Sequence, residues 1–199
     1  MKVVLATRNQ GKIRELTRIL RPLDFEFSSQ IDHKIESPDE TGLTFLENAL
    51  IKARAVSKNT GLPSIADDSG ISAPALGGAP GIYSARFAGE KATDQQNNLK
   101  LIRALEENQD ARACYYCALV FIQHELDPAP IVGIGKWQGH IIQNKRGSNG
   151  FGYDPHFWLE DFKCTAAELT PDFKNKISHR AKAAALLIKE LKNSSLSDA

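Results

Sequence analysis

Two long segments rich in β-branched and aromatic residues limit what this chain can fold into. They span roughly residues 112–124 and 130–143, and a short turn that contains Asp127 and Pro128 joins them. Segments of this composition are typical of strands, and two of them joined by a turn predict a β-hairpin of unusual length. We therefore expect a sheet in which two long strands are neighbours.

Helical patterns surround this predicted hairpin in the sequence. Thr44 with Glu47, and Thr93 with Gln96, have the spacing of a capping box, which begins a helix. Apolar residues at helical spacing predict one helix that includes Leu16, Ile19, Leu20 and Leu23, and a last helix at about 178–192. Short apolar runs at 3–6 and 63–66 predict strands between these helices. The pattern indicates an α/β fold, with a mixed β-sheet flanked by helices in one or two lobes.

Composition argues against several classes of function. Lys and Arg total 25 and Asp and Glu total 24, and this net charge of +1 gives no support for a nucleic-acid or membrane-binding surface. No apolar run approaches the roughly 20 residues of a membrane span, and the first one stops after Ala6, too early for a signal peptide. The three cysteines, an odd number, favour reduced thiols. We expect residues 1–199 to form a single cytoplasmic domain.

Cys114 and Cys117 have the C-x-x-C spacing of some zinc and redox sites. They lie in the first predicted hairpin strand, where residues three apart point to opposite faces. We therefore interpret both thiols as structural.

Two adjacent acids, Asp67 and Asp68, follow the predicted strand at 63–66 in the segment SIADDSG. Asp, Ser and Gly are ordinary turn residues, so a turn is one interpretation. In an extended backbone the two side chains would instead leave on opposite faces and have different roles. One could bind a hard cation such as Mg²⁺, with Glu40 from the Asp39-Glu40 pair as a second oxygen ligand. The alternative role of that second pair is to complement the dipole of the following helix.

Residues 7–12 join the first predicted strand to the first predicted helix and form a candidate anion site. Such a junction offers backbone N–H groups and the positive end of a helix dipole. Lys12 adds a charge, and Thr7 and Asn9 add neutral donors. The segment is not a Walker loop, because Ala6 and Ile13 depart from that pattern. A capped helix start without a ligand is the alternative.

The segment Phe151-Gly152-Tyr153-Asp154 follows a glycine-rich run at 146–150. An aromatic ring beside flexible glycines can stack on a nucleobase, as it does in proteins that bind single strands. A core phenylalanine at a tight turn is the alternative.

The segment Ser178-His179-Arg180 begins the last predicted helix, with Lys174 and Lys176 just upstream. A serine N-cap with solvated basic neighbours is the structural interpretation. Basic charge at a helix N-terminus opposes the dipole, however, and a bound polyanion would explain it.

Together these motifs resemble those of the non-standard purine nucleoside triphosphate pyrophosphatases, the inosine/xanthosine triphosphate pyrophosphatase family. The shared motifs are T-x-N-x-x-K at 7–12, E-T-G-x-T-F at 40–45, E-N-A at 47–49, A-D-D-S-G at 66–70, L-G-G-A-P-G-I-Y-S-A-R at 76–86, G-F-G-Y-D-P at 150–155 and S-H-R at 178–180. Each motif alone is weak. Seven in order over almost the whole chain form a highly specific signal.

The resemblance implies an elongated mixed sheet in two lobes, a central substrate cleft and a homodimer. It implies Mg²⁺-dependent hydrolysis of ITP, dITP or XTP to the monophosphate and pyrophosphate, which cleanses the nucleotide pool. By motif, Asp68 is the proton acceptor and, with Glu40, a metal ligand. Residues 7–12 and Lys52 face the phosphates, and Ser69 touches the substrate. The complete implied binding set is Thr7, Arg8, Asn9, Gln10, Gly11, Lys12, Lys52, Ser69, Phe151, Gly152, Tyr153, Asp154, Lys174, His179 and Arg180.

The residues also suggest how such a reaction would proceed. Lys12, Lys52 and Lys174 would neutralise phosphate charge with the metal, and Asp68 would deprotonate the attacking water. A fixed hydrogen-bond donor facing the 6-keto group would reject ATP by a factor of about 10⁴–10⁵. His179, Arg180 and backbone N–H groups near Phe151 are the candidate donors, and rejection of GTP must rest on its 2-amino group.

Two departures and two rivals accompany this hypothesis. Arg8 stands where the family often has a small residue, and Pro74 interrupts a segment that is more often polar. A phosphatase that releases single phosphates is one rival, distinguished by its products. A nucleotide- or RNA-binding module is the other, and it has no use for Glu40 with Asp68.

Overall fold

The structure is a computed structural model that describes residues 1–194, and it contains one mixed sheet. Seven strands follow the order β2-β1-β3-β4-β5-β6-β7, with parallel pairing of β1 to both β2 and β3 and antiparallel pairing of β5 to β6 and of β6 to β7. The strands are β1 Lys2–Leu5, β2 Glu26–Ser29, β3 Ser64–Ser72, β4 Arg112–Ile122, β5 Ile131–Ile141, β6 Phe157–Leu159 and β7 Cys164–Thr165.

The helices are α1 Gln10–Ile19, α2 Phe45–Thr60, α3 Asp94–Asn108, α4 Pro171–Ile177 and α5 His179–Asn193. The predicted mixed α/β sheet is confirmed.

The chain divides into two compact units. Unit 1 contains Met1–Asp68, Cys117–Gly135 and the C-terminal segment from His179, and unit 2 contains Ser69–Tyr116 and Lys136–Ser178. The boundary in β3 falls directly after Asp68.

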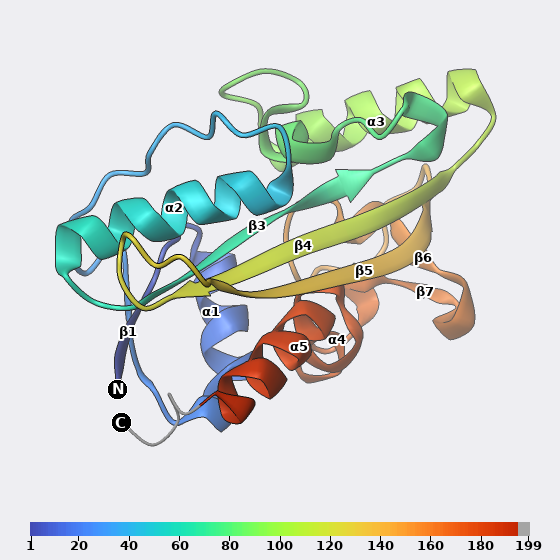
Figure 1. Cartoon of the computed structure of the whole chain (residues 1–199). Coiled ribbons are helices and arrows are strands. Elements are labelled where there is room, and N and C mark those ends of the chain that lie inside the picture. Colours follow the sequence, from blue (N-terminus) through green and yellow to red (C-terminus); the bar gives the residue numbers. More distant parts are fainter. Residues whose placement is uncertain (195–199) are drawn as a thin grey trace. The chain divides into compact units, whose positions relative to one another are not determined.

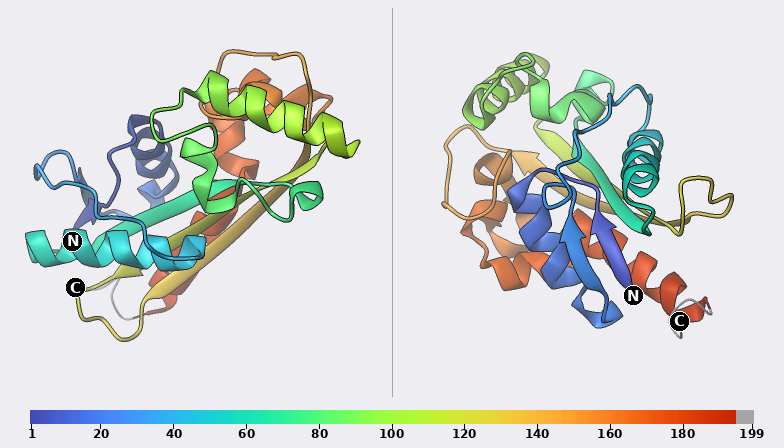
Figure 2. Two further views of the ribbon diagram at one scale, coloured as in Figure 1. Left: turned by 90° about the horizontal axis from the view of Figure 1, so that it is seen from above. Right: turned by 90° about the vertical axis from the view of Figure 1, so that its left-hand side faces the viewer.

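Unit 1 has helices on both faces of its strands. In Figure 1, α2 lies on one face and α1 and α5 lie on the other, and β1 and β2 run side by side in Figure 2. One apolar core fills the space between the strands and the α1–α5 pair; its buried residues are Val3, Leu5, Leu16, Leu20, Ile65, Cys117, Leu119, Phe121, Ala183, Ala184, Leu187 and Leu191. Successive residues of a strand point to opposite faces of the sheet. The two adjacent acids of β3 therefore face different helices.

Unit 2 has its own core, built around packed aromatic rings. The Tyr115 ring lies 4.6 Å from the Phe157 ring, and Trp137 lies 5.4 Å from Phe157, measured between centroids. Leu101, Ile102 and Leu105 add the buried side of α3 to this core. The core supports the segment 150–155 through Tyr153, which is one of its members.

The predicted hairpin and capping boxes are confirmed. Strands β4 and β5 are neighbours in the sheet, and the side-chain and backbone bonds of both capping boxes, at Thr44 and Thr93, are present. The strand predicted at 63–66 is longer than expected, because β3 continues through both acids to Ser72. Segment 171–177 is a helix, α4, that the sequence pattern did not predict.

No helix within residues 1–194 is both long and apolar enough to cross a membrane. No disulfide joins the cysteines in this part of the chain.

Candidate active site

Asp67 and Asp68 point to opposite faces of β3. Asp67 pairs with Lys12 of α1 and with Arg180 of α5, whereas Asp68 pairs with Lys52 of α2. The prediction that an extended backbone would separate the two side chains is confirmed. The interpretation of Asp67 as a residue that shapes a turn is wrong, because the strand runs straight through it.

Asp67 is the centre of a buried ion-pair network in unit 1. Its Oδ1 lies 2.5 Å from Lys12 Nζ, and its Oδ2 accepts a hydrogen bond of 2.8 Å from Arg180 Nε. The Cys117 thiol donates to the same Oδ2 at 3.1 Å, and Arg180 also pairs with Glu15. Burial opposes ionisation of Asp67, but Arg180 and Lys12 outweigh it and hold the pKa of this carboxyl well below its usual range. Asp67 therefore stays ionised and fixes both cations.

Asp68 and Glu40 share one ammonium group. Lys52 Nζ donates to Asp68 Oδ1 at 2.6 Å and to Glu40 Oε1 at 2.7 Å. Burial raises the pKa of Asp68, although Lys52 and Lys12 work in the other direction. Burial also opposes the charge on Lys52, but Asp68 and Glu40 outweigh it and raise its pKa. The three groups form a tight charged cluster, and the fold favours the charge of Asp68 less than it favours that of Asp67.

The start of α2 fixes the segment that carries Glu40. Thr44 Oγ1 accepts from Glu47 N at 3.2 Å, and Glu47 Oε2 accepts from the backbone N–H groups of Leu43 and Thr44. The N–H of Gly42 donates to the buried Asn48 side chain at 2.8 Å. The motifs at 40–45 and 47–49 are thus one local hydrogen-bonded structure that ends two residues from the carboxylate.

Residues 7–12 form a capped helix start. The Asn9 side chain accepts from Lys12 N at 3.1 Å, and Thr7 Oγ1 accepts from Asn9 N at 3.2 Å. Arg8 pairs with Glu36, and both side chains are largely exposed. Such an exposed pair contributes little to stability. The capped-helix interpretation is confirmed, and it leaves the anion-site interpretation open.

Asp154 organises the predicted base-binding segment in unit 2. Its Oδ2 accepts from Phe151 N at 3.0 Å and from Lys174 Nζ at 2.5 Å, and its Oδ1 accepts from Tyr115 Oη at 3.2 Å. The Lys174 ammonium also lies 5.1 Å from the centroid of the partly exposed Phe151 ring. A Cβ on Gly150, whose φ is +77°, would lie 2.0 Å from Asp154 Oδ2, so no other residue fits there.

The predicted residues divide between the two units. Unit 1 holds Thr7, Arg8, Asn9, Gln10, Gly11, Lys12, Glu40, Lys52, Asp68, His179 and Arg180, and unit 2 holds Ser69, Phe151, Gly152, Tyr153, Asp154 and Lys174. Within residues 1–194, no group of three or more His, Cys, Asp and Glu side chains forms a ready metal centre. Glu40 and Asp68 are therefore a pair of carboxylates rather than part of a larger cluster of such side chains in the described residues.

Comparison with known proteins places the chain in a family. The model of the Ham1 family matches residues 3–190. The chain belongs to the Ham1 family. A relative from Photorhabdus laumondii, named dITP/XTP pyrophosphatase, is 50% identical over 194 residues, which cover 96% of this chain and 98% of that relative.

Solved structures agree with this assignment to the Ham1 family. A HAM1 protein from Coxiella burnetii superimposes with a TM-score of 0.90 at 44% identity and covers 98% of this chain and 100% of its own. The Staphylococcus aureus Ham1 protein superimposes with a TM-score of 0.85 at 38% identity, covering 97% and 99%. The resemblance inferred from seven short motifs is confirmed, as is the fold class.

Several expectations about the site need correction in this Ham1-family chain. Lys174 and Lys176 lie in the last turn of α4, where basic charge complements the dipole. Arg180 does lie in the first turn of α5, but it is paired with Asp67 and Glu15. The interpretation of solvated basic neighbours is wrong for Lys174, which is buried.

The N–H groups of Phe151 and Gly152 already donate to Asp154 and Asp94, so neither is a spare donor for a base. Of the other predicted donors, Arg180 also already donates to Asp67 and Glu15, and both His179 and Arg180 are buried.

Several residues that organise the site were missed by sequence reasoning. Glu15 and Cys117 contact the network around Asp67, and Ser84 accepts from Tyr153 Oη at 2.8 Å through its carbonyl oxygen. Ser84 lies in the motif at 76–86, which is a signal that it matters, but the motif does not name its partner. Glu15 has no such signal, because its partner lies 165 positions away in the sequence.

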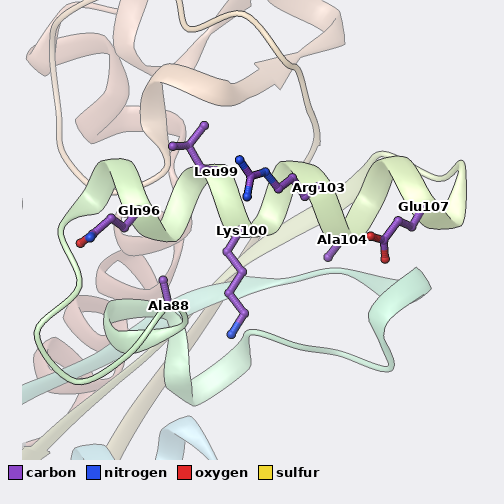
Figure 3. A pocket seen from close by; sticks show the side chains of 7 residues that line it. All are labelled: Ala88, Gln96, Leu99, Lys100, Arg103, Ala104 and Glu107. Atoms are coloured by element: carbon purple, nitrogen blue, oxygen red, sulfur yellow. The ribbon is translucent and has the colours of Figure 1, made fainter.

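A separate pocket in unit 2 lies along α3. It is lined by Ala88 and by residues of α3, among them Leu99, Lys100 and Arg103 (Figure 3). These residues differ from the predicted site residues. The Lys100 ammonium is already bonded to Phe87 O at 2.5 Å, which limits what it offers to a ligand.

Proposed function

We propose that this protein hydrolyses non-standard purine nucleoside triphosphates, namely ITP, dITP and XTP, to the nucleoside monophosphate and pyrophosphate. Membership of the Ham1 family and the names of relatives that match nearly the full length support this activity. The single structural observation that carries it is the cluster of Asp68, Lys52 and Glu40, with Lys12 acting electrostatically on the same carboxylate. An activity of this kind removes damaged nucleotides from the pool that polymerases use.

Unit 1 would bind the triphosphate. Lys12 and Lys52 each present an ammonium group, which can donate three hydrogen bonds. Their side chains are held by Asp67 and by the Asp68–Glu40 pair, so the cations are positioned before a nucleotide arrives. The capped loop 7–12 would add backbone and side-chain donors from Thr7 to Lys12, including Arg8 and Gln10.

Glu40 and Asp68 would hold Mg²⁺. Their chemistry fits, because Mg²⁺ in nucleotide enzymes takes one or two carboxylates and completes its shell with phosphate oxygens and water. The Lys52 ammonium between the two carboxylates supports this proposal, since it shows that their oxygens converge on one cation. When bound, Mg²⁺ would neutralise phosphate charge and polarise the scissile phosphoanhydride.

Asp68 would accept the proton from the attacking water. A general base works best when its pKa lies near the working pH, and burial moves the pKa of Asp68 upward from the usual carboxylate value. Lys52 keeps the carboxylate oriented through a hydrogen bond of 2.6 Å. Ser69, the next residue along β3, would contact the substrate.

Unit 2 would bind the base. The partly exposed Phe151 ring offers a stacking surface, and the Lys174 ammonium beside it offers a donor for a 6-keto oxygen. Adenine has an amino group at that position, so ATP would leave the ammonium facing another donor. Gly152, Tyr153 and Asp154 shape this surface, and the proposed binding set also includes His179 and Arg180 of unit 1.

A panel of purine triphosphates tests the proposed function. ITP, dITP, XTP, GTP and ATP are each supplied with Mg²⁺ to the wild type and to Asp68→Asn, and pyrophosphate release is measured. We expect strong release from ITP, dITP and XTP, little from ATP and GTP, and almost none from the variant, which should still bind nucleotide. Equal turnover of ITP and ATP would refute the proposed base preference. We also expect a homodimer, which light scattering can check.

A further inference from the structure

Two residues of α3 bind both sides of the Gly152 peptide. The N–H of Gly152 donates to Asp94 Oδ2 at 2.8 Å, and its carbonyl accepts from Asn98 Nδ2 at 2.9 Å. Asn98 Nδ2 also donates to the backbone carbonyl of Asp94 at 2.8 Å. The three residues therefore form a closed set of hydrogen bonds, which we call the Gly152 clamp. All three lie in unit 2.

The Gly152 clamp stabilises a left-handed backbone conformation at Gly152 through hydrogen bonds with α3. Gly152 has a φ of +63°, in the left-handed region. Its neighbours Phe151 and Asp154 are joined to each other through Phe151 N, but Gly152 takes its two partners from α3, 54 and 58 positions earlier in the chain. The peptide between the stacking ring and Asp154 is thus oriented by α3.

The burial of Asn98 and the carboxylate of Asp94 both strengthen the hydrogen bonds of the Gly152 clamp. Asn98 is 5% exposed, so a lost hydrogen bond there leaves a polar group without water. Asp94 is exposed in the first turn of α3, where the helix dipole favours a carboxylate. Its bond to Gly152 is therefore charge-assisted and stronger than a bond between neutral groups.

We propose that Asp94 and Asn98 are positioning residues for base recognition. They act through Gly152, by fixing the segment 151–154 on which the base would rest, and they contribute to the affinity for the base rather than to the chemical step. This inference depends on the proposed role of the segment 151–154. Neither residue belongs to any of the seven motifs, so the motifs alone give no reason to expect it.

Variants at position 94 test the clamp. Asp94→Ala removes the acceptor for Gly152 N–H, and Asp94→Asn keeps an acceptor oxygen without the charge. Gln95→Ala is the matched control, because Gln95 is an exposed residue of the same helical turn. The measurements are kcat and KM for ITP and for ATP, the dissociation constant of IMP by calorimetry, and that of inorganic tripolyphosphate, which has no base.

For Asp94→Ala we expect KM for ITP and the dissociation constant of IMP to rise about tenfold, as expected for one charge-assisted hydrogen bond. We expect kcat within about twofold of wild type, a smaller preference for ITP over ATP, and unchanged binding of tripolyphosphate. Asp94→Asn should recover most of the loss, and Gln95→Ala should match wild type.

Unchanged IMP binding in Asp94→Ala overturns the clamp, as does an equal loss of tripolyphosphate binding, which would indicate general damage. IMP binding is read without turnover. Failure of the proposed function would therefore appear separately, as a wild type that binds IMP but does not hydrolyse ITP.

Discussion

Asparagine should lower the free energy of unfolding much more at Asp67 than at Asp68, the two adjacent acids on β3. Asp67 accepts from Lys12 at 2.5 Å and from Arg180 at 2.8 Å, and its side chain is fully buried. Each hydrogen bond to a charged group contributes about 1.5–3 kcal/mol, and removing one partner of a buried pair costs about 3–5 kcal/mol. We expect Asp67→Asn to lower the free energy of unfolding by about 3–5 kcal/mol.

Asp68→Asn should behave differently because the fold supports its charge less well. Burial raises the pKa of Asp68, so its ionised form is less favourable in the folded protein than in the unfolded chain. Lys52 keeps Glu40 as a partner when Asp68 is neutralised. We expect Asp68→Asn to keep the free energy of unfolding within about 1 kcal/mol of wild type, or to raise it slightly.

Urea unfolding at neutral pH, followed by circular dichroism with a chelator present, compares the two variants. The chelator removes any stabilisation by bound metal, so that only the chain's own charges differ. A similar loss in both variants would refute the reasoning, because it would mean that both acids support the fold equally. A larger loss in Asp68→Asn would reverse the assigned roles.

Three further predictions concern the rest of the site. Gly150→Ala places a Cβ 2.0 Å from Asp154 Oδ2. The variant should lose about 1–3 kcal/mol of stability and show a higher KM for ITP. Wild-type unfolding together with a wild-type KM would contradict this. Burial and the neighbouring Asp67 raise the pKa of the Cys117 thiol well above its usual value. Iodoacetamide should therefore modify Cys117 only after denaturation, and peptide mapping of the treated native protein should find this thiol unmodified. Chelation should abolish ITP hydrolysis and excess Mg²⁺ should restore it, whereas turnover that persists in chelator would exclude the proposed role of Glu40 with Asp68.

Local signals made much of the fold predictable. The starts of α2 and α3 could be predicted because a capping box lies within four residues. The long strands β4 and β5 could be predicted from their composition. Helix α4 could not, because seven residues are too few to show helical periodicity.

Tertiary pairing explains what the sequence could not show at the site. Asp, Ser and Gly are poor strand formers, yet β3 runs through Asp67 and Asp68 because cations from three helices hold their carboxylates. Arg180 lies 113 positions from Asp67, and no local pattern joins them. The motifs identify which residues matter, and the partners of those residues follow only from the fold.

Product analysis tests the central proposal most directly. The wild type is incubated with dITP and Mg²⁺, and the products are separated and quantified by chromatography. We predict one pyrophosphate for each dIMP, without dIDP, and almost no product from Asp68→Asn. Release of orthophosphate with dIDP, or turnover in Asp68→Asn near that of wild type, would contradict the proposal.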